Sequence, residues 1–373
     1  MRAGLPLLLL VTSVAAAQKV PSTVLTKPDG QFPEPFSNVM GVRELPDGRV
    51  FVTDRLERTV SVLDFQTGDL TPVGREGQGP GEYVMPGPLF PFRGDSTLMV
   101  DFGAMRAVVL VGTQVGRTIS LAGTSGLPLI PAAIDGQGRL YGSMPTMSRG
   151  AGPGAAADSV PIARLNTVTG AIDTAGWVGA GSGGGVVAMR VSGGGRMTTG
   201  LQPYAAQDAW AVAPDGRIAI VHADAYRVDW IDGSGRRTAG PALPHTPVKI
   251  GPAEKEEWAD QMGGATMIMR TDGGASRAMR PERPNVDDLE WPAAKPPFET
   301  RGVLVTPEGE LWIRVSQQAG AKRQRYDVVD GRGQLVRHVE LADDQRLVGF
   351  GKGTLYTVRR DADDLQWLER YRR

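Results

Sequence analysis

Three aspartates and one histidine stand where side chains could act together. Asp54, Asp101 and Asp224 each follow a short apolar run, and His222 lies two residues before Asp224. These positions are expected strand ends, just before a loop. If the three carboxylates met, they could hold a divalent cation, which prefers several oxygen ligands, and His222 could act as a base. The competing interpretation is structural, because an aspartate at a strand end accepts backbone N–H bonds and shapes the loop.

Other candidates for catalysis are few. The chain has 3 histidines and no cysteine, which excludes thiol nucleophiles, thiolate metal sites and disulfides. Residues 179–184 match GxGxxG, but without the strand-and-helix context that dinucleotide binding requires. His245 precedes an expected helix, His338 falls on an expected outermost strand, and an exposed loop is the simplest placement for His222. We therefore predict no catalytic residue, no metal and no cofactor.

The elements that carry these residues repeat along the chain. Residues 41–73 contain four short β-rich runs, at 41–45, 50–53, 60–64 and 70–73. The first turn is Pro-Asp-Gly at 46–48, where proline presets φ and glycine accepts the left-handed closing position. Related turns open further units near Pro214 and Pro307. Six such units fit between Val20 and Arg373 at a spacing of about 40–50 residues, which is typical of the blades of a β-propeller.

One linker and one blade carry a family resemblance. The linker GREGQGPGEY at residues 74–83, and the blade segment DRLERTVSVLD at residues 54–64, resemble those of bacterial secreted six-bladed β-propellers related to NHL-repeat propellers. The resemblance covers nearly the whole chain after its first residues, although the turns of the second, third and sixth units depart from the pattern. It implies the propeller fold and a secreted location, and it implies no established reaction.

The prediction for the fold is an all-β, six-bladed propeller with a short helical insertion between blades 4 and 5, at about residues 246–292. Residues 249–262 favour a helix, because proline suits its first position, early glutamates suit its positive end and two glycines follow. Trp258 faces either the propeller rim or one mouth of the central channel. Blade 6 supplies only three strands, so we expect residues 23–26 to complete it.

The first residues predict export. A basic start, an apolar run at 5–14 and alanines at 15–17 follow the order of a secretory signal peptide. The expected organisation is a signal peptide at 1–17 and a propeller at 18–373. A lipid anchor would need a cysteine, and no other stretch is apolar enough to cross a membrane. Lys plus Arg and Asp plus Glu both total 41, which argues against nucleic acid. We expect a secreted or periplasmic monomer.

The functional expectation is a non-catalytic binding or scaffolding module with a small-molecule or protein partner at one face. Residues 75–83 join an outer strand to the next inner strand, and such connections share a face with the loops after the second strands. The candidate ligand-facing residues are Arg75, Glu82, Tyr83, Asp54, Asp101, His222 and Trp258. A structural alternative pairs Arg75 with Glu82 and uses the glycines for backbone geometry. The alternative function is a hydrolase or lyase with its site at the propeller mouth. It would be similar to lactonase-type propellers and would act with or without a metal.

Overall fold

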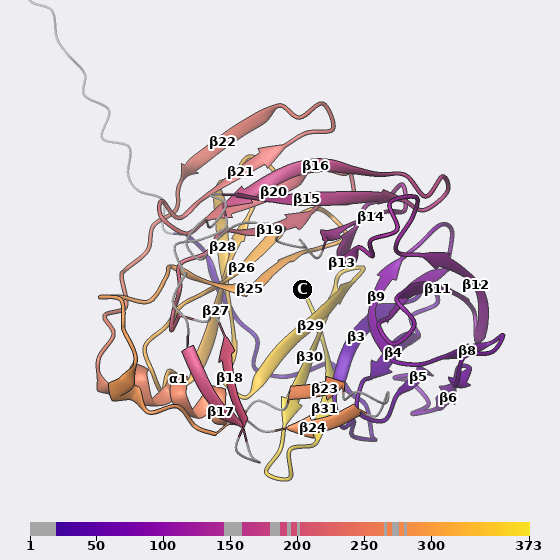
Figure 1. The fold of residues 1–373 in the computed structure, drawn as a ribbon, viewed down its shortest axis with the longest axis horizontal. Helices are drawn as coiled ribbons and strands as arrows, with labels where there is room; N and C mark the ends of the chain where they lie inside the picture. The colour runs from indigo at the N-terminus through magenta and orange to yellow at the C-terminus, as the bar shows by residue number, and fades with distance from the viewer. Residues whose placement is uncertain are drawn as a thin grey trace, which may run out of the picture.

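Six sheets stand in a ring around a central axis (Figure 1). The computed structural model describes residues 20–144, 159–179, 187–191, 195–199, 202–264, 267–270, 276–279 and 282–373. The predicted all-β, six-bladed propeller with one short helix late in the chain is confirmed. The expected signal peptide lies outside the described residues. Within them, no helix is both long enough and apolar enough to span a bilayer.

The strands of the blades follow one another in chain order. Blade 1 contains β3 (Val39–Glu44), β4 (Val50–Asp54), β5 (Thr59–Leu63) and β6 (Leu70–Pro72). Blade 2 contains β9 (Pro86–Pro91), β10 (Thr97–Asp101), β11 (Arg106–Val111) and β12 (Gln114–Ser120). Blade 3 contains β13 (Ile130–Ile134), β14 (Arg139–Ser143), β15 (Ser159–Asn166) and β16 (Ile172–Gly179). In each of these three blades the lowest-numbered strand is innermost (Figure 1).

The second half of the ring repeats this order. Blade 4 contains β19 (Ala209–Val212), β20 (Ile218–His222), β21 (Arg227–Ile231) and β22 (Arg237–Ala242). Blade 5 contains β25 (Phe298–Val305), β26 (Leu311–Val315), β27 (Arg323–Val329) and β28 (Leu335–Ala342). Blade 6 contains β29 (Gln345–Gly351), β30 (Thr354–Arg360) and β31 (Gln366–Arg372). Two further hairpins, β17 (Val187–Val191) with β18 (Gly195–Thr199) and β23 (Met267–Arg270) with β24 (Ser276–Met279), lie in the long connections on either side of blade 4.

The core lies between the blades. Strands β4 and β10 are buried at every position, because each blade has a neighbour on both faces, and their sequences are correspondingly apolar. Among the described residues, six apolar clusters fill the six junctions between neighbouring blades. The cluster between blades 6 and 1 joins Leu368 of β31 to Val50 of β4 through Phe32. The N-terminal segment is therefore part of the core.

A strand of two residues completes blade 6. β2 (Gly30–Gln31) pairs antiparallel with β31, and the Phe32 N–H donates to the Leu368 carbonyl at 2.9 Å. The expectation that residues 23–26 complete blade 6 is wrong. β1 (Ser22–Val24) instead pairs in parallel with β28 and forms a fifth strand of blade 5. The physical reason is burial: all three residues of β1 are exposed, whereas the Phe32 side chain is fully buried in the junction that has to be closed.

The insertion is fastened to blade 5. Its helix α1 (Pro252–Gly264) begins with proline, and Glu254 Oε2 accepts the Gly251 N–H at 3.0 Å, as in a capping box. The other Glu254 oxygen accepts the Ala319 N–H at 3.1 Å, in the loop between β26 and β27. Trp258 is 9% exposed and packs edge-on against Trp291, 5.6 Å between ring centroids. The helix lies away from the centre of the ring (Figure 1), and Trp258 serves packing.

The role of Phe32 in closing the ring can be tested by measuring stability. Replacement of Phe32 by alanine should lower the free energy of unfolding by roughly 3–5 kcal/mol, because a fully buried aromatic ring is lost from the junction of blades 6 and 1. The matched control is Val24→Ala in β1, where the side chain is 42% exposed, and it should change the value by less than about 0.5 kcal/mol. Urea unfolding curves give both values. A larger loss for Val24→Ala than for Phe32→Ala would show that β1 closes the ring instead.

Candidate functional site

Three loops on one face share a geometry. The loops after β4, β10 and β20 each contain four residues, and the fourth residue is in the left-handed region: Arg58 at φ 54°, Met105 at φ 48° and Tyr226 at φ 35°. In blades 1 and 2 the residue before the loop is the aspartate singled out from the sequence, Asp54 or Asp101. In blade 4 the same position holds His222, so the equivalent of the two aspartates is this histidine and not Asp224.

Asp54 and Asp101 cap their own loops. Asp54 accepts the N–H groups of Leu56 and Glu57 at 3.0 and 3.1 Å, and those of Ser37 and Asn38 at 2.7 and 3.0 Å. Asp101 makes the corresponding contacts in blade 2, including the Met85 N–H at 2.9 Å, and also accepts Arg106 Nε at 3.2 Å. Both side chains are almost fully buried. Each carboxylate is thus engaged within its own blade, which supports the structural interpretation of these two residues.

His222 lies in a network of charged groups rather than in an exposed loop. Its side chain is 12% exposed, and its Nδ1 is 2.8 Å from Asp208 Oδ2. On the other side of the ring, Nε2 is 3.2 Å from Asp229 Oδ2 and 2.6 Å from Arg237 Nη2. The expectation of an exposed loop histidine is therefore wrong. The physical reason is that His222 ends β20, where Asp208, just before β19, and Asp229 in β21 converge on the same edge.

The charges in this network support one another. The hydrogen bond to Asp208 raises the pKa of His222. Burial acts to raise the pKa of Asp208, but the hydrogen bonds from His222 and from the Ala223 N–H outweigh it and lower that pKa. Burial likewise opposes ionisation of Asp229, and its contacts with two arginines and His222 lower its pKa overall. The buried edge of blade 4 therefore holds ionised carboxylates on both sides of an imidazole.

The segment from Arg75 to Tyr83 is held by its own contacts. Strand β7 (Arg75–Glu76) pairs in parallel with β8 (Glu82–Tyr83). Arg75 and Glu82 form an ion pair at 2.8 Å, and Glu82 Oε2 accepts the Gly79 N–H at 2.7 Å. The hydrogen bond from Gly79 and, less strongly, the contact with Arg75 lower the pKa of Glu82. Tyr83 is 2% exposed, and its hydroxyl accepts the Val60 N–H at 3.0 Å.

A glycine in this segment is required by space as well as by conformation. Gly74 has φ +67°, and a Cβ there would lie 2.6 Å from Val115 Cγ2 and 2.9 Å from the Gly81 carbonyl oxygen. These contacts, together with the burial of Tyr83, favour the structural interpretation of the segment. Of its candidate ligand-facing residues, Arg75 is the one with a largely exposed side chain, at 81%.

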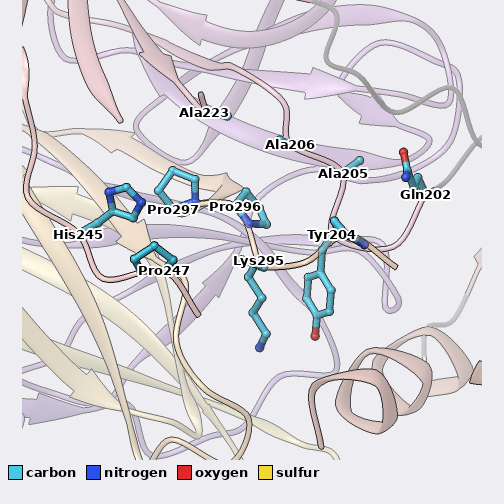
Figure 2. A pocket seen from close by; sticks show the side chains of 12 residues that line it. Gln202, Tyr204, Ala205, Ala206, Ala223, His245, Pro247, Lys295, Pro296 and Pro297 are labelled. Carbon is cyan, nitrogen blue, oxygen red and sulfur yellow. The ribbon is translucent and has the colours of Figure 1, made fainter. Parts of the chain in front are cut away.

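A pocket of about 290 Å³ opens where the insertion joins blades 4 and 5 (Figure 2). Its wall includes Ala223 in the loop after β20, His245 and Pro247 where the chain leaves blade 4, and Pro296 and Pro297 where it enters blade 5. The other lining residues are Gln202, Tyr204, Ala205, Ala206, Pro292, Ala294 and Lys295. This pocket could not be predicted from the sequence, because its wall is assembled from segments that are far apart in the chain and mostly lack reactive side chains.

The polar groups of the pocket are largely paired. Lys295 Nζ lies 2.9 Å from both Glu257 Oε2 and the Gln317 carbonyl oxygen, and 5.0 Å from the centroid of the Tyr204 ring. The Tyr204 hydroxyl donates to the Glu254 carbonyl at 2.8 Å. His245 packs edge-on against Tyr226 with 5.5 Å between ring centroids, and its ring has no hydrogen-bond partner among the described residues. His245 is thus one polar side chain that a ligand in this pocket would meet, beside Gln202.

The third histidine has a structural setting. His338 Nδ1 is 2.8 Å from Asp327 Oδ1, and the other oxygen of this buried aspartate accepts the Tyr226 hydroxyl at 2.7 Å. The network links blades 4 and 5 below the pocket. Of the predicted site residues, the structure brings His222 close to the pocket through Ala223, the next residue, while Asp54, Asp101, Arg75 and Glu82 belong to other blades.

Comparison with known proteins identifies the fold. No known family matches the sequence, and neither does any curated protein. A solved structure from the DUF4221 family of Bacteroides vulgatus aligns over 93% of this chain and 98% of its own, with 8% identity and a TM-score of 0.52. This chain has the fold of bacterial propeller proteins. The resemblance drawn from the sequence is confirmed at that level.

Two further solved structures align with TM-scores below 0.5. One is a virginiamycin B lyase from Staphylococcus aureus, at 10% identity and a TM-score of 0.41, covering 92% of this chain and 98% of the lyase. The other is a calcium-binding protein, regucalcin, from Agrobacterium tumefaciens, at 12% identity and a TM-score of 0.43, covering 94% and 95%. The differing names of these neighbours assign no function to this chain.

The contacts of the linker at residues 74–83 predict how two substitutions change stability. Tyr83→Phe removes the acceptor of the buried Val60 N–H and should lower the free energy of unfolding by about 1–3 kcal/mol. Arg75→Ala should leave the urea midpoint unchanged, because the arginine is exposed and screened by solvent. An unchanged midpoint for Tyr83→Phe would show that the hydroxyl makes no stabilising contact in the linker.

Proposed function

We propose that the protein is a non-catalytic binding propeller, whose ligand places a small apolar group in the pocket between blades 4 and 5. The observation that carries the proposal is the composition of the pocket wall, where prolines and alanines surround a single unpaired imidazole among the described residues. Binding pockets commonly combine an apolar lining with a few polar groups that fix orientation. In this pocket His245 is the polar group that would fix the orientation of the ligand.

The volume of the pocket limits the ligand. At about 290 Å³ it lies at the lower end of the range for small-molecule sites, which starts at roughly 300 Å³. It suits an apolar side chain of a partner protein or a small free molecule. Both sources offer the same chemistry, an apolar body with one group that hydrogen-bonds to imidazole.

The wall is also preorganised. Proline has a fixed φ, and four of the lining residues are prolines: Pro247, Pro292, Pro296 and Pro297. Lys295 is 6% exposed and held by two hydrogen bonds. A wall that is already ordered loses little conformational entropy when a ligand binds, which favours affinity despite the small contact area.

The lactonase-like alternative relied on acids converging at the propeller mouth. Asp54 and Asp101 are each occupied by backbone N–H groups of their own loops, so the observations favour binding over hydrolysis or elimination at those residues. Export to the periplasm or the exterior, and action as a monomer, remain part of the proposal. The basic, apolar and small-residue order of positions 1–17 supports the location.

The proposal can be tested by a nuclear magnetic resonance screen of small apolar amides and aromatic fragments. Because the chain has 3 histidines, three ring signals report on three separate places. A bound fragment should shift the His245 signal and leave that of His338 in place. Ala205→Phe should abolish this shift, because the added ring fills the pocket.

The matched control is Ala104→Phe, an equally large change at an exposed position in the loop after β10, which should bind fragments like the unchanged chain. If a partner protein displaces a bound fragment and reverses the shift of the His245 signal, the pocket belongs to a side chain of that partner. Fragment shifts that persist in Ala205→Phe, or a screen in which no apolar fragment moves His245, would contradict the proposal.

A further inference from the structure

Blade 4 departs from the loop pattern of blades 1 and 2 in a way that assembles possible metal ligands. Where the other two blades have a capping aspartate, blade 4 has His222, and carboxylates stand on either side of it in the chain at Asp208 and Asp224. One ligand atom from each of the three residues lies within 4.8 Å of the others. We propose that Asp208, His222 and Asp224 bind a first-row divalent cation, of which Zn²⁺ fits best. This site is additional to the apolar pocket of the proposed function.

The three donor atoms lie close together. Asp208 uses Oδ1 to accept the Ala223 N–H at 3.0 Å, which leaves Oδ2 facing His222 Nδ1 at 2.8 Å. The carboxylate of Asp224 has no hydrogen-bond or ion-pair partner among the described residues, and its side chain is exposed. A cation between these atoms would take one nitrogen and two oxygens from the protein and keep its solvent side open for water.

The surroundings supply the support that metal-bound histidines usually have. Asp229 is 1% exposed, and its Oδ2 lies 3.2 Å from His222 Nε2, on the far side of the ring from Asp208. A carboxylate that accepts from the second ring nitrogen fixes the ring and makes the first nitrogen a better ligand. The carboxylate of Asp208 is itself anchored by a backbone N–H. These two contacts hold the side chains of His222 and Asp208 in place, unlike those of unconnected acidic residues on a surface.

Both arginines at this edge contact Asp229 through their Nε. Arg227 Nε and Arg237 Nε lie 3.0 and 2.7 Å from its two oxygens. Asp229 offsets one of these two positive charges, while Asp208 and Asp224 add two negative charges that have no ion-pair partner except His222 in the described part of the chain. Three aspartates against two arginines leave one negative charge around a neutral imidazole, which an added divalent cation would offset.

Cation binding requires one proton to move within the histidine. Arg237 Nη2 lies 2.6 Å from Nε2, and since arginine can only donate, Nε2 accepts and the ring proton is on Nδ1, shared with Asp208. A cation at Nδ1 displaces this proton to Nε2, where Asp229 Oδ2 can accept it. Arg237 is 49% exposed and can move its Nη2 away while its Nε stays on Asp229. The ring remains neutral, as metal ligation by imidazole requires.

The donor set selects the class of cation. Imidazole favours Zn²⁺ and its transition-metal neighbours, whereas Ca²⁺ and Mg²⁺ prefer sites made of oxygen alone. Three protein ligands with an open position are also usual for zinc sites that retain water. The chain has no cysteine, so no thiolate competes for the zinc ion.

The test is isothermal titration of Zn²⁺, Ca²⁺ and Mg²⁺ into the untagged chain after removal of metals by a chelator. We expect one zinc ion per chain, bound at least about tenfold more tightly than either of the other two cations. Asp224→Asn should weaken zinc binding by at least about tenfold, and because Asp224 is exposed its loss should leave the melting temperature unchanged. His222→Gln should have an equal or larger effect on zinc.

The matched control is Asp215→Asn, which removes the same charge from an exposed aspartate of blade 4, in the turn between β19 and β20. It should bind zinc like the unchanged chain. The proposal is overturned if the unchanged chain does not bind zinc with a dissociation constant below about 100 µM, or if Asp224→Asn and Asp215→Asn bind it equally well. Since Ala205→Phe alters only the apolar pocket, intact zinc binding in that variant would separate the two sites.

Discussion

The ring depends on pairing of the two-residue strand β2 with β31. Each blade is apolar on both faces, so a propeller with one open junction would expose a core surface on two blades at once. The N-terminal segment removes that exposure by placing Phe32 between blades 6 and 1 and by covering the edge of β31. Because the first residues of the structure hold the last blade in place, the remaining five junctions can be filled by consecutive strands, and the loops on the faces are free to vary.

On one of those faces, blade 4 departs from the loop pattern that blades 1 and 2 share. The loops after β4 and β10 use an aspartate to satisfy backbone N–H groups, and both aspartates, Asp54 and Asp101, are almost fully buried. Blade 4 replaces the aspartate with His222, recruits Asp208 to hold the loop through the Ala223 N–H, and leaves Asp224 exposed. The same loop forms part of the wall of the apolar pocket beneath the insertion. A small departure from the repeat thus brings two sites with different chemistry to adjacent positions.

Local patterns in the sequence were sufficient for the fold, and insufficient for the site. The turns at residues 46–48 and near Pro307 could be predicted because proline, glycine and β-rich runs act over a few residues. The pairing of β1 with blade 5 could not be predicted. Two strand edges, those of β28 and β31, were open to the N-terminal segment, and the exposed residues of β1 pair with the first of them. His222 was singled out, but its partners come from two neighbouring strands, and a register is needed to know that Asp208 and Asp229 flank it. Asp208 stands directly before a β-rich run, which is the one local signal that pointed to it.

The central claim is that blade 4, where it departs from the repeat, carries the function of this face. X-ray diffraction at the zinc absorption edge, from crystals of the untagged chain grown with zinc, tests it most directly. The account predicts an anomalous peak within bonding distance of Asp208, His222 and Asp224, with Asp229 hydrogen-bonded to the far side of the imidazole. A peak at His245 or His338 instead, or none in crystals that contain the intact loop after β20, would contradict it.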